Sequence, residues 1–257
     1  MGSTLDLSGR VAVVIGGTSG LGRAIAIGLA EAGADVVATG RREELAASAS
    51  REIEALGRRS LTATVDVLER HSVDSLRDRV LERFGHMEIL VYAAGAVARR
   101  PSLDVTEAEW AAALDVNATG ALRACQSFYD ALAASRQGRV IHIASLNSFV
   151  SLTQVAAYAA AKSALLSLTR SLAVEWAASG VNVNAIAPGV FRTDLNSKLL
   201  DETERGRELL MRTPMRRFGC PEELVGAAVL LASDAASFIT GQCLVVDGGF
   251  LASGVNT

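Results

Sequence analysis

The chain has 257 residues, of which 50% are hydrophobic and 21% are charged, and its formal net charge is −3. This composition is typical of a globular protein and excludes disordered, collagen-like and strongly basic nucleic-acid-binding classes. The sequence contains neither the about 18 apolar residues in a row that a membrane span needs nor a secretory signal, so we expect a cytoplasmic protein without membrane or nucleic-acid partners.

Short apolar strands alternate with longer helical patterns along the chain. The first strand is a β-branched run that is typical of a strand buried on both faces. The predicted strands are Arg10–Ile15, Asp35–Thr39, Ser60–Val65, Glu88–Tyr92, Arg139–Ala144, Val181–Ala187 and Cys243–Val246. The predicted helices are Leu21–Ala32, Glu43–Leu56, Ser72–Phe84, 106–135, 155–178 and Glu222–Ser233.

This alternation predicts an α/β fold of the Rossmann type. A single domain over 1–257 would hold a doubly wound, seven-stranded parallel sheet with helices on both faces and ligands at the carboxyl ends of the strands. The segment 191–218 interrupts the alternation, and its Arg, Glu and Leu content predicts a helical insertion. We expect it to act as a lid over the site; the alternative is a surface helical pair that closes nothing.

A glycine-rich turn follows the first predicted strand. Glycine allows a tight turn and lets the backbone approach a pyrophosphate at the start of a helix. The context between a strand and a helix favours a dinucleotide site over plain packing. The residues expected to contact the cofactor here are Gly16, Thr18, Ser19, Gly20, Leu21 and Gly22.

The residues after the second strand bear on the choice of cofactor. An acid at this point binds a ribose 2′-hydroxyl, whereas Arg suits a 2′-phosphate. Here the strand ends at Thr39 and is followed by Gly40, Arg41 and Arg42, with no acid among them, which favours NADP over NAD. The alternatives are that both arginines are solvated or that Arg41 stacks on adenine, which would leave NAD as the cofactor. Asp66, with Val67 beside it, is expected near the adenine.

A Ser, a Tyr and a Lys form the candidate catalytic group. Ser145 follows the fifth strand, and Tyr158 and Lys162 are four residues apart, which places them side by side on a helix. A neighbouring ammonium is expected to lower the pKa of the Tyr158 phenol, so that it could exchange a proton near neutral pH. The few Cys and His residues show no disulfide or metal-ligand spacing, so we expect no metal.

These patterns resemble the short-chain dehydrogenase/reductase family over essentially the whole chain. The resemblance implies that Tyr158 is the general acid/base, that Ser145 binds the substrate oxygen, and that Lys162 holds the nicotinamide ribose. It also implies that Asn117 supports a proton-relaying water. The other matching segments are Ala94-Gly95, Pro188-Gly189 with Thr193, both expected to bind cofactor, and Asp247-Gly248-Gly249.

Two positions depart from that family's pattern. Ile15 stands where Thr is usual, and Tyr92 stands at the start of a segment that is usually Asn-Asn-Ala-Gly. Both positions normally join two strands through polar contacts near the cofactor. We expect apolar packing to replace that link.

A weaker resemblance points to gluconate 5-dehydrogenase-like and 2-dehydro-3-deoxy-gluconate 5-dehydrogenase-like members, through Arg99-Arg100-Pro101 and the segments 143–149 and 184–189. It implies a sugar acid or polyol as substrate. The residues expected to bind it are Arg99, Arg100, Asn147 and Arg192, with one guanidinium holding a carboxylate. The alternatives are that these arginines are exposed charges or subunit contacts, and that the protein is a 3-oxoacyl carrier-protein reductase or a non-catalytic dinucleotide-binding regulator.

The two long predicted helices, 106–135 and 155–178, carry more apolar residues than one sheet face needs. Surplus apolar helix faces usually bind a partner, and closed two-fold symmetry is the common arrangement, so we expect a homotetramer. The residues that suggest it are Ala124, Phe128, Leu132, Leu165, Leu168 and Leu172.

Overall fold

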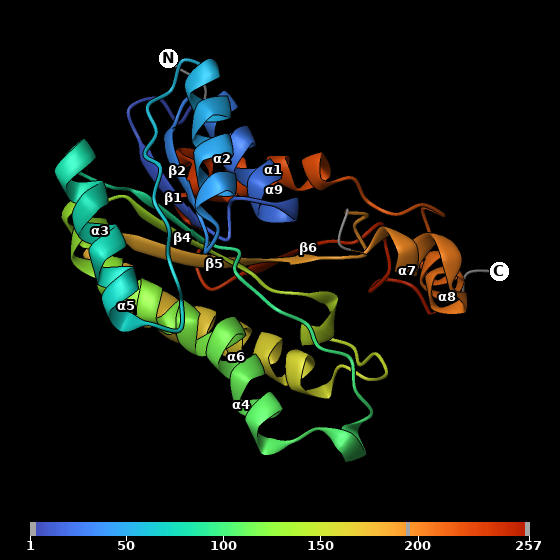
Figure 1. Ribbon diagram of the computed structural model, residues 1–257. Helices are drawn as coiled ribbons and strands as arrows, with labels where there is room; N and C mark the ends of the chain where they lie inside the picture. Colours follow the sequence, from blue (N-terminus) through green and yellow to red (C-terminus); the bar gives the residue numbers. More distant parts are fainter. Residues whose placement is uncertain (1–3, 194–195, 255–257) are drawn as a thin grey trace.

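The centre of the protein is a six-stranded parallel sheet with the strand order β2-β1-β3-β4-β5-β6 (Figure 1). The computed structural model describes residues 4–193 and 196–254. The order reverses beside β1, as in a doubly wound fold, and this places the strand ends of both halves around one crevice. The strands are β1 Val11–Ile15, β2 Asp35–Thr39, β3 Ile89–Tyr92, β4 Gly138–Ile143, β5 Val181–Pro188 and β6 Cys243–Val246.

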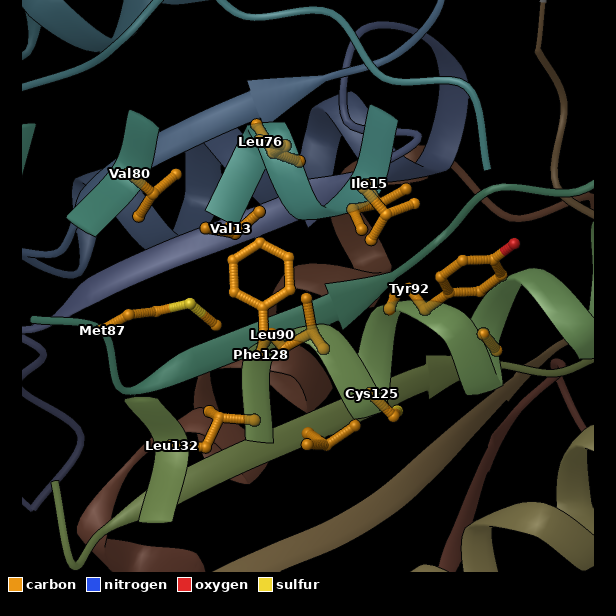
Figure 2. Close-up of a cluster of buried hydrophobic side chains, with 14 of the residues drawn as sticks. Val13, Ile15, Leu76, Val80, Met87, Leu90, Tyr92, Cys125, Phe128 and Leu132 are labelled. Atoms are coloured by element: carbon orange, nitrogen blue, oxygen red, sulfur yellow. The ribbon is translucent and has the colours of Figure 1, made fainter. Parts of the chain in front are cut away.

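Helices cover both faces of the sheet, because successive strand residues point to opposite sides and both sides are apolar. Val13 and Ile15 of β1 face one core, which α3, α5 and α6 cover (Figure 2). Ala12 and Val14 face the other core, beneath α1, α2 and α9. These six helices are α1 Gly20–Glu31, α2 Glu43–Ala55, α3 Arg70–Phe84, α5 Gly120–Ala134, α6 Ala156–Trp176 and α9 Val225–Ala232.

The predicted strand Ser60–Val65 is wrong, so the sheet has six strands and not seven. This segment runs beside β2 but pairs with it only at an isolated bridge between Gly40 and Thr64. Along these two segments, side-chain hydroxyls donate to main-chain carbonyls that a regular strand pair would use. Ser60 Oγ donates to the Val36 carbonyl and Thr39 Oγ1 to the Ala63 carbonyl, both at 2.7 Å. Side-chain bonds of this kind compete with a regular ladder.

The predicted helix 106–135 consists of two α-helices, α4 and α5, joined by a π turn. A capping box between Thr106 and Glu109 starts α4, Glu107–Leu114. The π turn covers Asp115–Thr119, and α5 continues from Gly120. π turns are rare and frequently lie at functional sites.

The insertion between β5 and β6 is helical as predicted. It contains α7, Ser197–Glu202, and α8, Glu204–Arg212 (Figure 1). Residues 194 and 195 of the predicted lid lie outside the described residues. Leu200 and Leu209 of these helices pack against Leu146, next to the predicted catalytic serine.

The apolar residues that suggested a homotetramer have another explanation. Ala124, Phe128, Leu132, Leu165 and Leu172 are buried in the core of this same chain, and Leu168 packs against that core. These residues are numerous because the helices have to cover one face of the sheet. They therefore do not indicate an apolar helix face that needs a partner chain. Within the described part of the chain, no helix is long and apolar enough to cross a membrane.

Candidate active site

The predicted site residues meet at the carboxyl ends of the strands. The glycine-rich turn follows β1, Ala94 and Gly95 follow β3, and Ser145 follows β4. Tyr158 and Lys162 come from α6, and Asn117 lies in the π turn. The fold therefore brings the dinucleotide and catalytic motifs to one edge of the sheet, as the parallel topology requires.

The glycine-rich turn is too crowded for side chains. A Cβ atom on Gly16 would lie 2.5 Å from the Ala94 nitrogen, and one on Gly22 would lie 2.1 Å from the Gly16 carbonyl oxygen. Gly16 also has a φ of +83°. The helix α1 that starts here has no acidic residue in its first turn, so its positive end is not compensated. A backbone cradle at an uncompensated helix start fits a dinucleotide pyrophosphate.

Of the predicted nicotinamide-end residues, Pro188 and Gly189 lie against the end of β6 and the segment that follows it, and Thr193 lies beside the glycine-rich turn. Pro188 is the last residue of β5 and pairs with Val246. A Cβ atom on Gly189 would lie 2.5 Å from the Cα of Asp247, so the two chain segments touch. The Thr193 N–H donates to Asn196 Oδ1 at 2.8 Å, and the Thr193 methyl lies 3.9 Å from where a Cβ on Gly20 would stand.

The end of β2 approaches the same turn. A Cβ atom on Gly40 would lie 2.9 Å from Thr18 Oγ1. Arg41 and Arg42 follow on the surface, and neither forms an ion pair within residues 4–193 and 196–254. Asp66 is half-buried; its Oδ1 accepts the Leu68 N–H at 3.0 Å, with the buried Val67 between them.

Lys162 is buried beneath the predicted catalytic tyrosine. The residue is only 3% exposed, and its Nζ donates a hydrogen bond to the Ile143 carbonyl at 2.7 Å. Nζ lies 5.7 Å from the centroid of the Tyr158 ring. Burial lowers the pKa of Lys162 to about 8, because a charged ammonium loses hydration there.

The expected lowering of the Tyr158 pKa by the ammonium is not found. Burial raises the pKa of Tyr158, and a hydrogen bond with the Ser145 hydroxyl opposes that shift. The reason is geometric: the ammonium is directed to the Ile143 carbonyl instead of the phenol oxygen. Ser145 Oγ also accepts the Asn147 N–H at 3.1 Å, which fixes the turn that carries it.

Asn117 presents an unsatisfied acceptor to the site. Its Nδ2 donates to the carbonyls of Ala96 and Ala113, both at 2.9 Å. Its Oδ1 is buried and has no hydrogen-bond partner among the described residues. A Cβ atom on Gly95 would lie 2.8 Å from this Oδ1 and 3.4 Å from Lys162 Nζ, so both atoms border the same small space. Such a buried acceptor requires a donor.

Sequence reasoning missed a polar role for Tyr92. Ile15 is packed in the apolar core as expected, but the Tyr92 hydroxyl donates to the Val116 carbonyl at 2.6 Å. Position 92 therefore retains a polar link, which runs to the π turn instead of a neighbouring strand. The departure from the family's usual Asn was the signal that could have found it.

The predicted substrate-binding arginines differ in their surroundings. Arg100 pairs with Glu109 at 2.8 Å, and Arg192 pairs with Asp201 at 2.6 Å. Arg99 is exposed and has no carboxylate partner among the described residues. Burial, followed by the charge of Arg205, lowers the pKa of Arg99. Arg205, on α8, was not predicted.

Asn147 combines a buried amide with a position next to Ser145. Its Oδ1 has no hydrogen-bond partner in the described part of the chain. Across residues 4–193 and 196–254, no group of three or more His, Cys, Asp or Glu side chains is arranged to hold a metal ion.

Comparisons with known proteins match nearly the whole chain to one family. The family model described as "Enoyl-(Acyl carrier protein) reductase" matches residues 16–251. The 2-dehydro-3-deoxy-D-gluconate 5-dehydrogenase of Escherichia coli K12 is 38% identical over 97% of this chain and 98% of its own.

Two solved structures have the same fold. A gluconate 5-dehydrogenase of Burkholderia cenocepacia, in complex with NADP and tartrate, is 37% identical with a TM-score of 0.92 over 98% of each chain. A 3-oxoacyl (acyl-carrier-protein) reductase of Agrobacterium tumefaciens, with NADP bound, is 36% identical with a TM-score of 0.88 over 95% of each chain. With the motifs at the strand ends, these matches show that the chain belongs to the short-chain dehydrogenase/reductase family of NAD(P)-dependent oxidoreductases.

Proposed function

We propose that the protein interconverts a secondary alcohol and a ketone of a sugar acid, with NADP as the cofactor. The observation that carries this proposal is the convergence of Ser145, Tyr158 and Lys162 at the rim of the glycine-lined cradle. The names of the relatives support the choice of a gluconate-type substrate.

The chain's own residues account for the proton chemistry. When bound, the nicotinamide supplies or accepts the hydride. In the reducing direction, Tyr158 gives the proton of its hydroxyl to the carbonyl oxygen, and Ser145 binds that same oxygen. Lys162 and the unpartnered Asn117 Oδ1 border one space behind them, which suits a relay that returns the proton to Tyr158.

A carboxylate on the substrate suits Arg99 best of the three predicted arginines. The charges of Arg100 and Arg192 are already compensated by Glu109 and Asp201. Arg205 lies close enough to Arg99 for mutual repulsion, and its guanidinium donates to the Thr153 carbonyl at 3.1 Å. Two guanidiniums that repel one another favour an anion between them. Asn147, with its spare amide acceptor, is proposed to bind a substrate hydroxyl.

NADP is proposed over NAD because Arg41 and Arg42 follow β2 without an acid before them. They follow Gly40, which lies against Thr18 of the glycine-rich turn, and this suits a phosphate on the adenine ribose; NADP is present in both solved structures named above.

The helices α7 and α8 are proposed to act as a lid. Their apolar residues pack on Leu146 beside Ser145, and Arg205 reaches across to Thr153. A lid there would exclude water from the reacting carbon.

A homotetramer is proposed through an exposed surface at the edge of the sheet, and not through the buried helix residues that first suggested it. The edge strand β6 leaves Leu244 exposed, and Val174 of the adjacent α6 is 82% exposed. Gly241, just before β6, lies against Ala173, so these apolar residues are neighbours. A monomeric mass in light scattering at micromolar concentration would reject the tetramer.

An absorbance assay with NADPH tests the function. The substrates are a keto sugar acid, the matching neutral ketose and a 3-oxoacyl thioester, since one of the similar structures is an acyl-carrier-protein reductase. We expect the sugar acid to have a kcat/KM roughly tenfold or more above the ketose, because a hydrogen bond to a charged group is worth about 1.5–3 kcal/mol. A preference for the thioester or the ketose would reject the sugar acid. The variant Arg99→Ala should lose the preference, and Arg207→Ala on α8 is the control.

A further inference from the structure

Tyr92 has a buried phenol whose hydroxyl leaves the apolar core. It is the last residue of β3 and is fully buried, with Leu90, Val13 and Cys125 in the same cluster. In Figure 2 its hydroxyl points out of this cluster, away from Met87. Burying a hydroxyl without a hydrogen bond costs free energy, so the Tyr92 hydroxyl is expected to have a specific acceptor in the folded protein.

The partner is the main chain of the π turn. Tyr92 Oη donates to the Val116 carbonyl at 2.6 Å. Within this turn the hydrogen bonds are displaced by one residue from the α pattern: the Gly120 N–H donates to the Asp115 carbonyl, five residues back. Burial raises the pKa of Tyr92, so its hydroxyl remains a donor at any working pH.

The approach of the phenol depends on a glycine. A Cβ atom on Gly120 would lie 2.3 Å from Tyr92 Oη and 3.1 Å from the Cβ of Val67. The first distance is too short for any real side chain and the second is tight, so an added Cβ would displace the phenol and only glycine lets it reach Val116. The tyrosine, the glycine and the π turn therefore form one fitted unit.

That unit holds the residue next to Val116 in the candidate active site. The Nδ2 of Asn117 donates hydrogen bonds to the carbonyls of Ala96 and Ala113. Its Oδ1 therefore faces the space that Lys162 Nζ also borders. The Ala113 carbonyl lies four residues back and is the one an α-helix would give to the main-chain N–H of Asn117. The position of Oδ1 therefore depends on the π turn.

We infer that Tyr92 is a positioning residue for catalysis, which fixes the π turn through Val116 and so aims Asn117 Oδ1 at the proton-relay space beside Lys162. The inference rests on the proposed function, because it assigns Tyr92 a task in that proton relay. Tyr92 itself does not touch the substrate.

The test is Tyr92→Phe, which removes one oxygen and leaves the ring. We expect kcat to fall about tenfold, as the loss of one buried hydrogen bond implies, with the Kd for NADPH unchanged. The solvent isotope effect on kcat should increase, because proton transfer becomes more nearly rate-limiting. A purely structural role would leave that isotope effect and the pH profile unchanged.

Two further variants separate position from stability. Tyr129→Phe is the matched control: its hydroxyl bonds Ser179 Oγ at 2.9 Å, away from the site, so kcat should stay at the wild-type value. Gly120→Ala should reproduce the kinetic defect of Tyr92→Phe, because the new Cβ displaces the phenol. Alanine is otherwise the better helix former, so a defect there cannot come from helix propensity.

A double-mutant cycle with Asn117→Ala identifies the route of the effect. If Tyr92 acts through Asn117, Tyr92→Phe changes kcat little in the Asn117→Ala background. The same tenfold loss in both backgrounds would overturn the inference, as would a folded Tyr92→Phe enzyme with the wild-type kcat and pH profile. A wild-type protein without any dehydrogenase activity would instead reject the proposed function.

Discussion

The turn after β1 and the β4–α6 region lie at the same edge of the sheet but are built in opposite ways. The turn is shaped by the absence of side chains, since Gly16 and Gly22 allow backbone segments to touch. The β4–α6 region is shaped by polar side chains that are partly or wholly buried, above all Lys162 and Ser145. In the proposed function, the first region binds the cofactor by its shape and the second carries out the proton transfer.

This difference predicts how each region responds to substitution. Added volume should damage the glycine-rich turn even when it brings no new chemistry. A change of a single polar atom should damage the β4–α6 region even when volume is conserved, because buried polar groups have no water to replace a lost partner.

The largest expected effect is on Tyr158→Phe. The variant should lose hydride transfer by about 10²–10⁴-fold, since a positioned general acid contributes that much. Its Kd for NADPH, measured by fluorescence titration, should match wild type because the ring still packs. Near-normal turnover would remove Tyr158 from the chemistry.

The next effect is on Gly22→Ala in the glycine-rich turn. The new Cβ would lie 2.1 Å from the Gly16 carbonyl oxygen, so the turn must open. We expect the affinity for NADPH to fall about 100-fold, and the protein to be destabilised by about 2–3 kcal/mol. Titration calorimetry and urea unfolding measure the two.

The control for that variant is Gly226→Ala in α9, where an added Cβ meets nothing within 4 Å. This change should leave the affinity intact and stabilise the helix by about 0.5–1 kcal/mol. Equal behaviour of the two glycines would contradict the steric account of the turn.

The buried polar side of the comparison also predicts a pH effect on stability. His142 is fully buried between Cys125 Sγ at 3.3 Å and Thr169 Oγ1 at 2.9 Å. Burial, with the Lys162 charge second, lowers the pKa of His142 to about 3. In the unfolded chain the imidazole of His142 is protonated below about pH 6.5, whereas in the folded protein it stays neutral down to about pH 3. The free energy of unfolding therefore falls as the pH drops through this window.

From pH 7 to pH 5 this single histidine should cost about 2 kcal/mol of the free energy of unfolding. Urea unfolding at the two pH values measures it in the wild type and in His142→Gln. The glutamine variant should show a smaller difference between the two pH values. An identical pH dependence in both proteins would show that His142 does not control it.

The smallest effect is expected for Arg41→Ala. A surface guanidinium on a phosphate is partly screened, so we expect about a tenfold loss in NADP affinity. The affinity for NAD should stay constant. Similar losses for both cofactors, or a wild-type preference for NAD, would show that Arg41 does not select the phosphate.

The sequence predicted the two regions unequally. The glycine-rich turn and the Tyr158–Lys162 spacing are local patterns, so their positions follow from neighbours in the chain. The strand at Ser60–Val65 was wrong because its apolar pattern does not reveal that Ser60 and Thr39 hydroxyls occupy the carbonyls of a ladder. Such side-chain bonds depend on tertiary placement.

Two further features of the site depend on distant segments. The π turn forms where Asn117 reaches the Ala96 carbonyl and Tyr92 reaches Val116, each more than twenty residues away in the sequence. Helical periodicity alone gave one uninterrupted helix there. Arg205 was missed because its position near Arg99 is set by how α8 packs on Leu146.

The most direct test of the central claim follows the hydride itself. NADPH deuterated at its transferable position is incubated with the keto sugar acid and the enzyme, and the product is analysed by mass spectrometry and NMR. The account predicts one deuterium on the carbon that gains the hydroxyl, incorporated at least about 100-fold more slowly in the presence of Tyr158→Phe. A product without deuterium, or equal labelling by both proteins, would contradict it.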